Sequence, residues 1–108
     1  MAINSRAKGK AGELELARIL REYGQDTRRG VQYHGGPESP DVVGLPGIHI
    51  ECKRVEALNI DAAMNQAIKD SAGDIPAVFH RKNRTPWKVT LLLSDFMKLY
   101  GGYKGVIE

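Results

Sequence analysis

Two acidic residues and a lysine in the middle of the chain have side chains and a spacing suited to holding a metal ion beside an ammonium group. Pro40-Asp41 is followed, after nine intervening residues, by Glu51-Cys52-Lys53 at the end of an isoleucine-rich run. In a β-strand, residues two apart project from the same face about 7 Å apart. Glu51 and Lys53 are therefore predicted to stand side by side.

Such a group fits the hydrolysis of a phosphodiester bond. Two carboxylates can bind Mg²⁺, which polarises phosphate oxygens and activates water. An adjacent ammonium group can orient the water or neutralise developing charge, and the backbone carbonyl of Cys52 offers a further oxygen ligand. Taken singly, a Glu-x-Lys pair on a strand is usually a solvent-facing ion pair, and an Asp after Pro is usually a turn residue. The prediction therefore rests on their combination.

A third carboxylate is expected from a helix near the N-terminus. The segment 6–23 has helical spacing, with Asn4 or Ser5 as its cap and Gly24 as its stop. Glu13 shares the apolar, core-facing stripe of this helix, where a carboxylate needs a partner. The stripe continues through Leu16, Ala17 and Leu20. Charges at ion-pairing spacing are expected on the solvent side, at Glu15, Arg18 and Glu22.

Gly9 on the same helix allows two interpretations. Helical side chains lean toward the N-terminus, so Glu13 reaches back over Gly9, where the missing side chain leaves room for a hydrated ion or a phosphate. Alternatively, Gly9 and Gly12 let the helix pack closely on a sheet.

The remaining segments predict an α/β fold, a mixed β-sheet flanked by helices, in the order α-β-β-β-α-β-β-α. A strand–helix–strand unit normally forms a right-handed crossover between parallel strands, whereas a hairpin is antiparallel. After the first helix we expect a weak strand within 25–33, a loop over 34–40, a hairpin of 41–45 and 48–53 around Pro46-Gly47, a helix over 60–71 capped by Asn59 or Asp61 and ended by Gly73, strands over 77–80 and 87–93, and a short helix around 96–100 capped by Ser94. The glycine-rich tail from Gly101 to Gly105 is expected to be loosely held.

The hairpin register decides whether the two acidic residues can meet. A strict two-residue turn at Pro46-Gly47 would pair Asp41 with Cys52 and place Asp41 on the side away from Glu51. The proposed chemistry requires otherwise. We therefore expect a one-residue offset, through a longer loop or a bulge at Gly44 or Gly47, that places Asp41 opposite Lys53.

Length and charge limit the class of protein. The 108 residues form about one domain, spanning 1–108. A net charge of +3 and a pI near 9.1 suit a polyanionic partner. The basic residues that could contact nucleic acid form separate clusters: Arg6, Lys8 and Lys10; Arg28 and Arg29; Arg81, Lys82 and Arg84. Any one cluster alone is ordinary solvated surface.

Cysteine and histidine usage argues against other classes. Cys52 is the only cysteine, so no intramolecular disulfide can form, and the three scattered histidines lack zinc-ligand spacing. The sequence has neither a signal peptide nor an apolar run that could span a bilayer. We therefore expect a cytoplasmic protein of a bacterial, archaeal or phage-infected cell, with no membrane association.

Three stretches of the chain resemble the PD-(D/E)XK nuclease superfamily, and within it the archaeal Holliday-junction resolvases and related small phage nucleases. They are Lys8-Gly9-Lys10-Ala11-Gly12-Glu13-Leu14-Glu15-Leu16, which is similar to the first-helix motif of those resolvases, then Pro40-Asp41, and then Ile50-Glu51-Cys52-Lys53. The order of elements through Leu93 also agrees, so the resemblance covers most of the chain.

The resemblance implies a restriction-endonuclease-like core and a specific set of roles. Asp41 and Glu51 would bind Mg²⁺, with Mn²⁺ as a substitute, Lys53 would be catalytic, and Glu13 would complete the site. The expected activity is a metal-dependent DNA endonuclease acting on branched or structured DNA in recombination, as a homodimer. Two-fold symmetry suits paired cuts in a four-way junction. Apolar residues for a dimer contact are available in the last helix, or they cover the sheet: Phe96, Met97, Leu99 and Tyr100.

Two departures from the resolvase pattern leave the substrate class open. The linker 28–40 is glycine-rich and contains His34, and Gln66 on the second helix is similar to the helical Gln that follows Glu-x-Lys in the VRR-NUC branch. Both residues could be accessory site members, although each is more often an ordinary loop or helix position. The alternatives are therefore a VRR-NUC-like or phage nuclease of other DNA specificity, or a non-catalytic nucleic-acid-binding module on the same fold. An interaction domain without a nucleic-acid role would leave Glu13 and the basic clusters unexplained.

Overall fold

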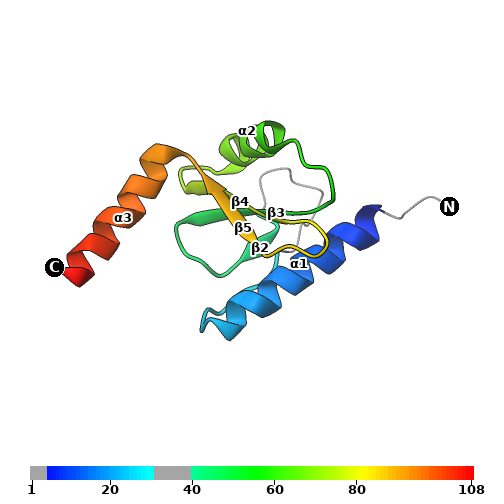
Figure 1. Ribbon diagram of the computed structural model, residues 1–108, viewed down its shortest axis with the longest axis horizontal. Helices are drawn as coiled ribbons and strands as arrows, with labels where there is room; N and C mark the ends of the chain where they lie inside the picture. Colours follow the sequence, from blue (N-terminus) through cyan, green and yellow to red (C-terminus); the bar gives the residue numbers. More distant parts are fainter. Residues whose placement is uncertain (1–4, 31–39) are drawn as a thin grey trace.

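The computed structural model describes residues 5–30 and 40–108, and the side chains from Gly9 onward in the first of these ranges. Within these ranges the fold is mixed α/β, with a five-stranded mixed sheet and three helices in the expected order (Figure 1). The elements are α1 (Ser5–Glu22), β1 (Arg28–Arg29), β2 (Val42–Val43), β3 (Ile48–Arg54), α2 (Ile60–Asp70), β4 (Ile75–Arg81), β5 (Lys88–Leu91) and α3 (Leu93–Ile107). His34 and most of the loop expected over 34–40 lie outside the described residues.

Helix α1 ends as its sequence predicts. Gly24 has a positive φ of 92°, and its N–H donates to the Arg21 carbonyl at 2.9 Å. The N–H of Gln25 donates to the Leu20 carbonyl at 3.2 Å. This pair of bonds is a Schellman motif, in which glycine takes the left-handed position without a side-chain clash.

The sheet has strand order β1-β2-β3-β4-β5. Strands β1, β2 and β3 pair antiparallel, β3 and β4 pair parallel through the α2 crossover, and β4 and β5 pair antiparallel. The expected mixed sheet is therefore confirmed. Helix α2 is capped by Asn59, whose side chain accepts the Ala62 N–H at 3.0 Å.

Helices α1 and α2 cover opposite faces of the sheet, and each face has its own apolar core (Figure 1). On the α1 face, Ile50 and Cys52 of β3 pack with Leu16 and Ala17. On the α2 face, Val78 of β4 packs with three residues of the helix: Ala63, Met64 and Ala67. Because side chains alternate along a strand, Glu51, which lies between Ile50 and Cys52, belongs to the α2 face.

The β2–β3 hairpin has the expected one-residue offset. Val42 pairs with Ile50, whereas a strict two-residue turn would pair Val43 with Ile50. The extra residue on the first strand is Gly44, with a φ of 120°. A Cβ at this position would lie 2.2 Å from the Asp26 carbonyl oxygen, so only glycine fits here.

The direction of the offset differs from the expectation. Continuing the pairing of Val42 with Ile50 brings Asp41 level with Glu51, two positions before Lys53. The predicted alignment of Asp41 opposite Lys53 is therefore wrong. The extra residue lies before the turn rather than after it, and this moves Asp41 the other way along β3.

The C-terminal segment differs most from the expectation. Helix α3 begins at Leu93 and not near Phe96, Leu92 is its N-cap without a side-chain hydrogen bond, and the helix continues to Ile107. The predictions of a Ser94 cap and a loosely held tail from Gly101 to Gly105 are therefore wrong. Each glycine destabilises a helix by about 1 kcal/mol relative to alanine. The backbone hydrogen bonds of the turns on either side offset this cost, so the helix continues past these positions.

Helix α3 also projects from the body of the molecule and does not lie on the sheet (Figure 1). The principal extents are 54 × 30 × 27 Å. Its apolar side chains are mostly exposed, so they do not cover the sheet. No helix in the described part of the chain is both long enough and apolar enough to cross a membrane.

Candidate functional site

Asp41 lies at the point where strand β2 separates from β3. Its backbone N–H donates to the Ile50 carbonyl at 2.9 Å, and its Oδ2 accepts the Cys52 N–H at 2.9 Å. The carboxylate thus occupies the edge of β3 that a longer β2 would have covered. Two backbone-anchored contacts hold it beside Glu51.

Glu51 is a buried carboxyl group between His49 and Asp41. Only 5% of the residue is exposed, and its Oε1 lies 2.9 Å from His49 Nε2. Burial first, and then the negative charge of Asp41, raise the pKa of Glu51 to about 7, against the opposing effect of His49. The Asp41–Glu51 pair therefore favours binding one positive charge, a proton or a metal ion, between its oxygens.

Lys53 follows Glu51 on the same face of β3 and pairs across the sheet with His80 of β4. It is partly exposed and lines a surface pocket of about 390 Å³ together with Gln66 of α2. The Gln66 amide also donates a hydrogen bond to the buried carboxylate of Asp70. The structure thus brings together Lys53 and the Gln66 that the sequence marked as an accessory candidate.

Glu13 approaches the same sheet edge from the α1 side. Its Oε1 accepts a hydrogen bond from Arg29 Nε at 3.1 Å. Burial raises the pKa of Glu13 and the Asp41 charge raises it further, whereas Arg29 and then Lys53 lower it. Glu13 is therefore within electrostatic range of both Asp41 and Lys53, and Arg29 is its direct partner.

The donor set at this edge fits a hard divalent cation. Asp41 and Glu51 are adjacent oxygen donors, and Mg²⁺ commonly binds one or two carboxylates and keeps several waters. Among residues 5–30 and 40–108, no three His, Cys, Asp or Glu side chains are arranged to hold a metal ion. Glu13 is bonded to Arg29, while Asp41 lies level with Glu51, and the convergence of all three carboxylates on one ion stays a prediction.

The two glycines of α1 have different surroundings. A Cβ on Gly12 would lie 2.5 Å from the Arg54 Cβ, so this position needs glycine for close packing on β3. A Cβ on Gly9 would meet nothing within 4 Å. The close-packing interpretation therefore holds for Gly12 and is wrong for Gly9, which leaves open space one turn before Glu13.

Two residues near the site were missed or misjudged by sequence reasoning. His49 is 3% exposed and pairs with Glu51. The sequence could have indicated this position, because His49 alternates with apolar residues in the same way as Glu51 and Lys53 and therefore shares their strand face. Glu15 was expected to face solvent, and this is wrong. It accepts hydrogen bonds from Arg81 and from Trp87 Nε1, the latter at 3.2 Å, and lies 3.5 Å from Arg54 Nε.

The basic residues expected to contact nucleic acid fall into three groups. Exposed in the structure are Lys10, Arg28, Lys82 and Arg84. Bound to carboxylates of α1 are Arg29 on Glu13 and Arg81 on Glu15. The side chains of Arg6 and Lys8 lie outside the described residues. Lys10, Arg28, Lys82 and Arg84 are therefore directly available to a polyanion.

No protein-family model matches this sequence, and no curated protein matches it either. The function is therefore inferred from the residues of the site and their geometry.

Proposed function

We propose that this protein is a Mg²⁺-dependent DNA endonuclease with a restriction-endonuclease-like core of the PD-(D/E)XK kind. The observation that carries the proposal is the position of Asp41 level with Glu51 at the sheet edge, with Lys53 next on the same strand face. Two adjacent carboxyl groups, one of them buried, destabilise a fold unless a cation binds them. A catalytic metal site would explain why they lie side by side.

Different residues of the site are proposed to have different roles in hydrolysis. Asp41, Glu51 and the Cys52 carbonyl would hold Mg²⁺, and Mn²⁺ could replace it. When bound, the ion would polarise a phosphate oxygen and lower the pKa of a bound water. Lys53 is proposed to stabilise the charge that develops as water attacks phosphorus and the bond to the departing oxygen breaks. Glu13, held by Arg29, is proposed as a positioning residue for water.

The proposed substrate is branched or otherwise structured DNA, bound by the exposed cations on β1 and in the β4–β5 loop. The proposed working unit is a homodimer that contacts itself through α3. The helix leaves eight apolar side chains between 40% and 84% exposed, on the order of 1,000 Å² of apolar surface given the size of such side chains. Monomers rarely expose so large a patch, and a stable interface buries about 800 Å² per partner.

A second candidate is a nuclease of the VRR-NUC kind, with another DNA specificity. The shared pocket of Lys53 and Gln66 favours it, because a helical Gln beside Glu-x-Lys belongs to that pattern. A binding module without catalysis is the less favoured alternative, since adjacent carboxylates repel a phosphate unless a cation lies between them.

Cleavage assays on defined DNA test the proposal. Labelled four-way junction, flap, duplex and single-stranded DNA are incubated with Mg²⁺, with Mn²⁺ and with EDTA. We expect metal-dependent cleavage of at least one substrate and a loss of more than 100-fold in Asp41→Asn. Asp74→Asn removes an exposed carboxylate in the loop before β4 and should cleave normally. Metal-independent cleavage, full activity of Asp41→Asn, or no cleavage of any substrate would each refute the assignment.

A further inference from the structure

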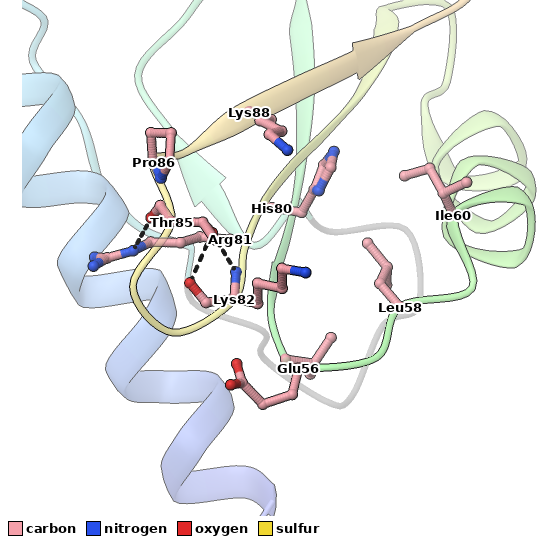
Figure 2. A pocket seen from close by; sticks show the side chains of 10 residues that line it. Glu56, Leu58, Ile60, His80, Arg81, Lys82, Thr85, Pro86 and Lys88 are labelled. Atoms are coloured by element: carbon pink, nitrogen blue, oxygen red, sulfur yellow. Dashed lines mark hydrogen bonds between the residues drawn. The ribbon is translucent and has the colours of Figure 1, made fainter.

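A second pocket lies between the β4–β5 hairpin and the segment that joins β3 to α2. Its volume is about 320 Å³, within the range of small-ligand sites. Figure 2 shows the Lys82 and Lys88 amino groups and the His80 ring facing the apolar side chains of Leu58 and Ile60. The pocket therefore combines cationic groups with an apolar wall.

The charges around this pocket favour an anion. Glu56 is the only carboxylate among the lining residues, and it is turned away from the pocket (Figure 2). It accepts the Asn83 N–H at 2.6 Å and lies 4.0 Å from Arg54 Nη1. The Glu56 carboxylate thus binds the hairpin loop and does not face the Lys82 and Lys88 amino groups in the pocket.

His80 gives the pocket a flat, uncharged surface between the two lysines. Its Nε2 lies 2.9 Å from the Thr90 hydroxyl. Partial burial lowers the pKa of His80, and the charge of Lys88 lowers it further. The ring is therefore neutral at pH 7 and presents an aromatic surface to a ligand, to which a planar group can stack.

The pocket adjoins the one that contains Lys53. His80 pairs with Lys53 across β3 and β4, so both side chains stand on the α2 face. Val55 and Leu58 line both this pocket and the one that contains Lys53 and Gln66. A strand whose phosphate reached Lys53 could therefore continue into the pocket with its neighbouring nucleotide.

We propose that this pocket binds one nucleotide of the DNA strand, adjacent to the phosphodiester at Lys53. Lys82 and Lys88 take the phosphate, and the base lies against Leu58, Ile60 and the His80 ring. Stacking of a base on an aromatic ring and contact of its phosphate with lysines are ordinary modes of single-strand binding. The position next to the cut rests on the proposed function, whereas nucleotide binding itself does not.

Binding of a nucleotide is tested by NMR titration in EDTA, so that no cleavage occurs. The probes are thymidine 5′-monophosphate, thymidine and inorganic phosphate. We expect the monophosphate to shift the Leu58 and Ile60 methyl signals and the His80 ring signals, and to bind at least 5-fold more tightly than thymidine or phosphate. If up to 10 mM thymidine 5′-monophosphate causes no such shifts, the proposal is overturned, because the binding free energy would then be below about 3 kcal/mol.

Charge variants assign the contact. In Lys82→Ala/Lys88→Ala the affinity for thymidine monophosphate should fall at least 10-fold, whereas Lys69→Ala, an exposed lysine of α2, should bind as the unmodified protein does. Equal losses in both variants would show general charge attraction and overturn the proposal. A pentathymidylate should displace the monophosphate; failure to do so would assign the pocket to a free nucleotide and overturn the strand-binding claim.

Cleavage kinetics separate this proposal from the proposed function. The double variant should raise KM for DNA at least 10-fold and leave kcat within about 3-fold, because the pocket binds the strand and not the reacting phosphate. Nucleotide binding without cleavage of any DNA would refute the proposed function and leave the binding site standing. Cleavage with an unchanged KM in the double variant would refute the site and leave the nuclease assignment standing.

Discussion

At the scale of single residues, Glu51 is the carboxyl group of the candidate site whose pKa is raised most, to about 7. It is buried against the sheet, 2.9 Å from His49 and in contact with Asp41. A proton shared by the two carboxyl groups relieves their repulsion, as does a metal ion. The same arrangement that prepares the site for a cation therefore destabilises the fold when no cation is present.

The first prediction concerns stability and pH. The pKa of Glu51 is raised from its ordinary value of 4.5 to about 7, so between these values the unfolded chain loses its proton before the folded chain does. The free energy of unfolding should therefore fall as pH rises from about 4.5 to 7, by about 3 kcal/mol from this residue. Thermal unfolding in EDTA at pH 5 and pH 8 measures the loss.

Glu51→Gln is the matched variant for this prediction. It keeps the shape of the side chain and cannot ionise, so it should be less sensitive to pH over this interval and more stable than the unmodified protein at pH 8. Mg²⁺ should raise the melting temperature of the unmodified protein at pH 8 and have little effect on the variant. A Glu51→Gln protein that is less stable at pH 8 in EDTA would contradict the assignment of the charge.

The second prediction concerns Lys53. Lys53→Ala should lower kcat by about 100-fold or more and largely preserve DNA affinity, because the ammonium acts on charge that develops in the transition state. Affinity should depend instead on Arg28 and the Lys82–Arg84 loop, and weaken steeply with salt. Single-turnover cleavage and fluorescence anisotropy separate the two effects. An active Lys53→Ala protein would remove the lysine from the mechanism.

At the scale of elements, the β2–β3 hairpin controls where Asp41 lies. Gly44 is the extra residue on its first strand, at a φ of 120° and with no room for a Cβ. Gly47 in the turn also has a positive φ, 86°, but a Cβ there would meet nothing within 4 Å. The two glycines thus differ in steric space and share a backbone conformation that other residues rarely adopt.

This difference gives the third prediction. Gly44→Ala should destabilise the fold by about 3 kcal/mol or more, because it combines backbone strain with a clash against the Asp26 carbonyl, whereas Gly47→Ala should cost about 1 kcal/mol from strain alone. Urea denaturation measures both. Near-equal losses would show that Gly44 has room to relax, and would weaken the steric explanation of the register.

At the scale of the whole molecule, α3 gives the protein its length. Residues 93–107 form a helix of 15 residues that extends from the sheet (Figure 1), and the radius of gyration of 14.3 Å exceeds the value of about 13 Å typical for this chain length. Phe96 and Tyr100 stack on each other at a centroid distance of 6.4 Å, and Tyr103 lies 6.1 Å from Tyr100. Aromatic residues in such an exposed row are typical of interfaces.

The fourth prediction is that a second copy of the chain covers this row. The protein should sediment as a dimer at micromolar concentration, and Phe96→Glu/Tyr103→Glu should be a folded monomer, since α3 lies outside both cores. Lys98→Gln, on the polar side of the helix, should leave the dimer intact. On a four-way junction the monomeric variant should nick one strand and lose paired cuts. A monomeric unmodified protein would remove the paired-cut mechanism.

The order of the elements and the local chemistry of the site follow from the sequence alone. The spacing of apolar residues and the positions of glycine and capping residues predicted the first helix with its Gly24 stop, a cap at Asn59 or Asp61, and the mixed sheet. These features depend on residues close together in the chain. The same local reasoning placed Glu51 and Lys53 on one strand face, since a strand alternates sides with every residue. The three-residue error at the start of the last helix, and its missed continuation through three glycines, show where propensity alone misleads.

Which distant groups meet depends on how the sheet and the helices pack together. The contact of Asp41 with Glu51 depends on a bulge at Gly44 that is set by the Asp26 backbone, and the pairing of Glu13 with Arg29 depends on how α1 lies over β1. The ion pair of Glu15 on α1 likewise depends on a neighbour on another element, Arg81 of β4. Such contacts join residues far apart in the chain, so their free energies are absent from any local pattern and arise only when the sheet and helices pack.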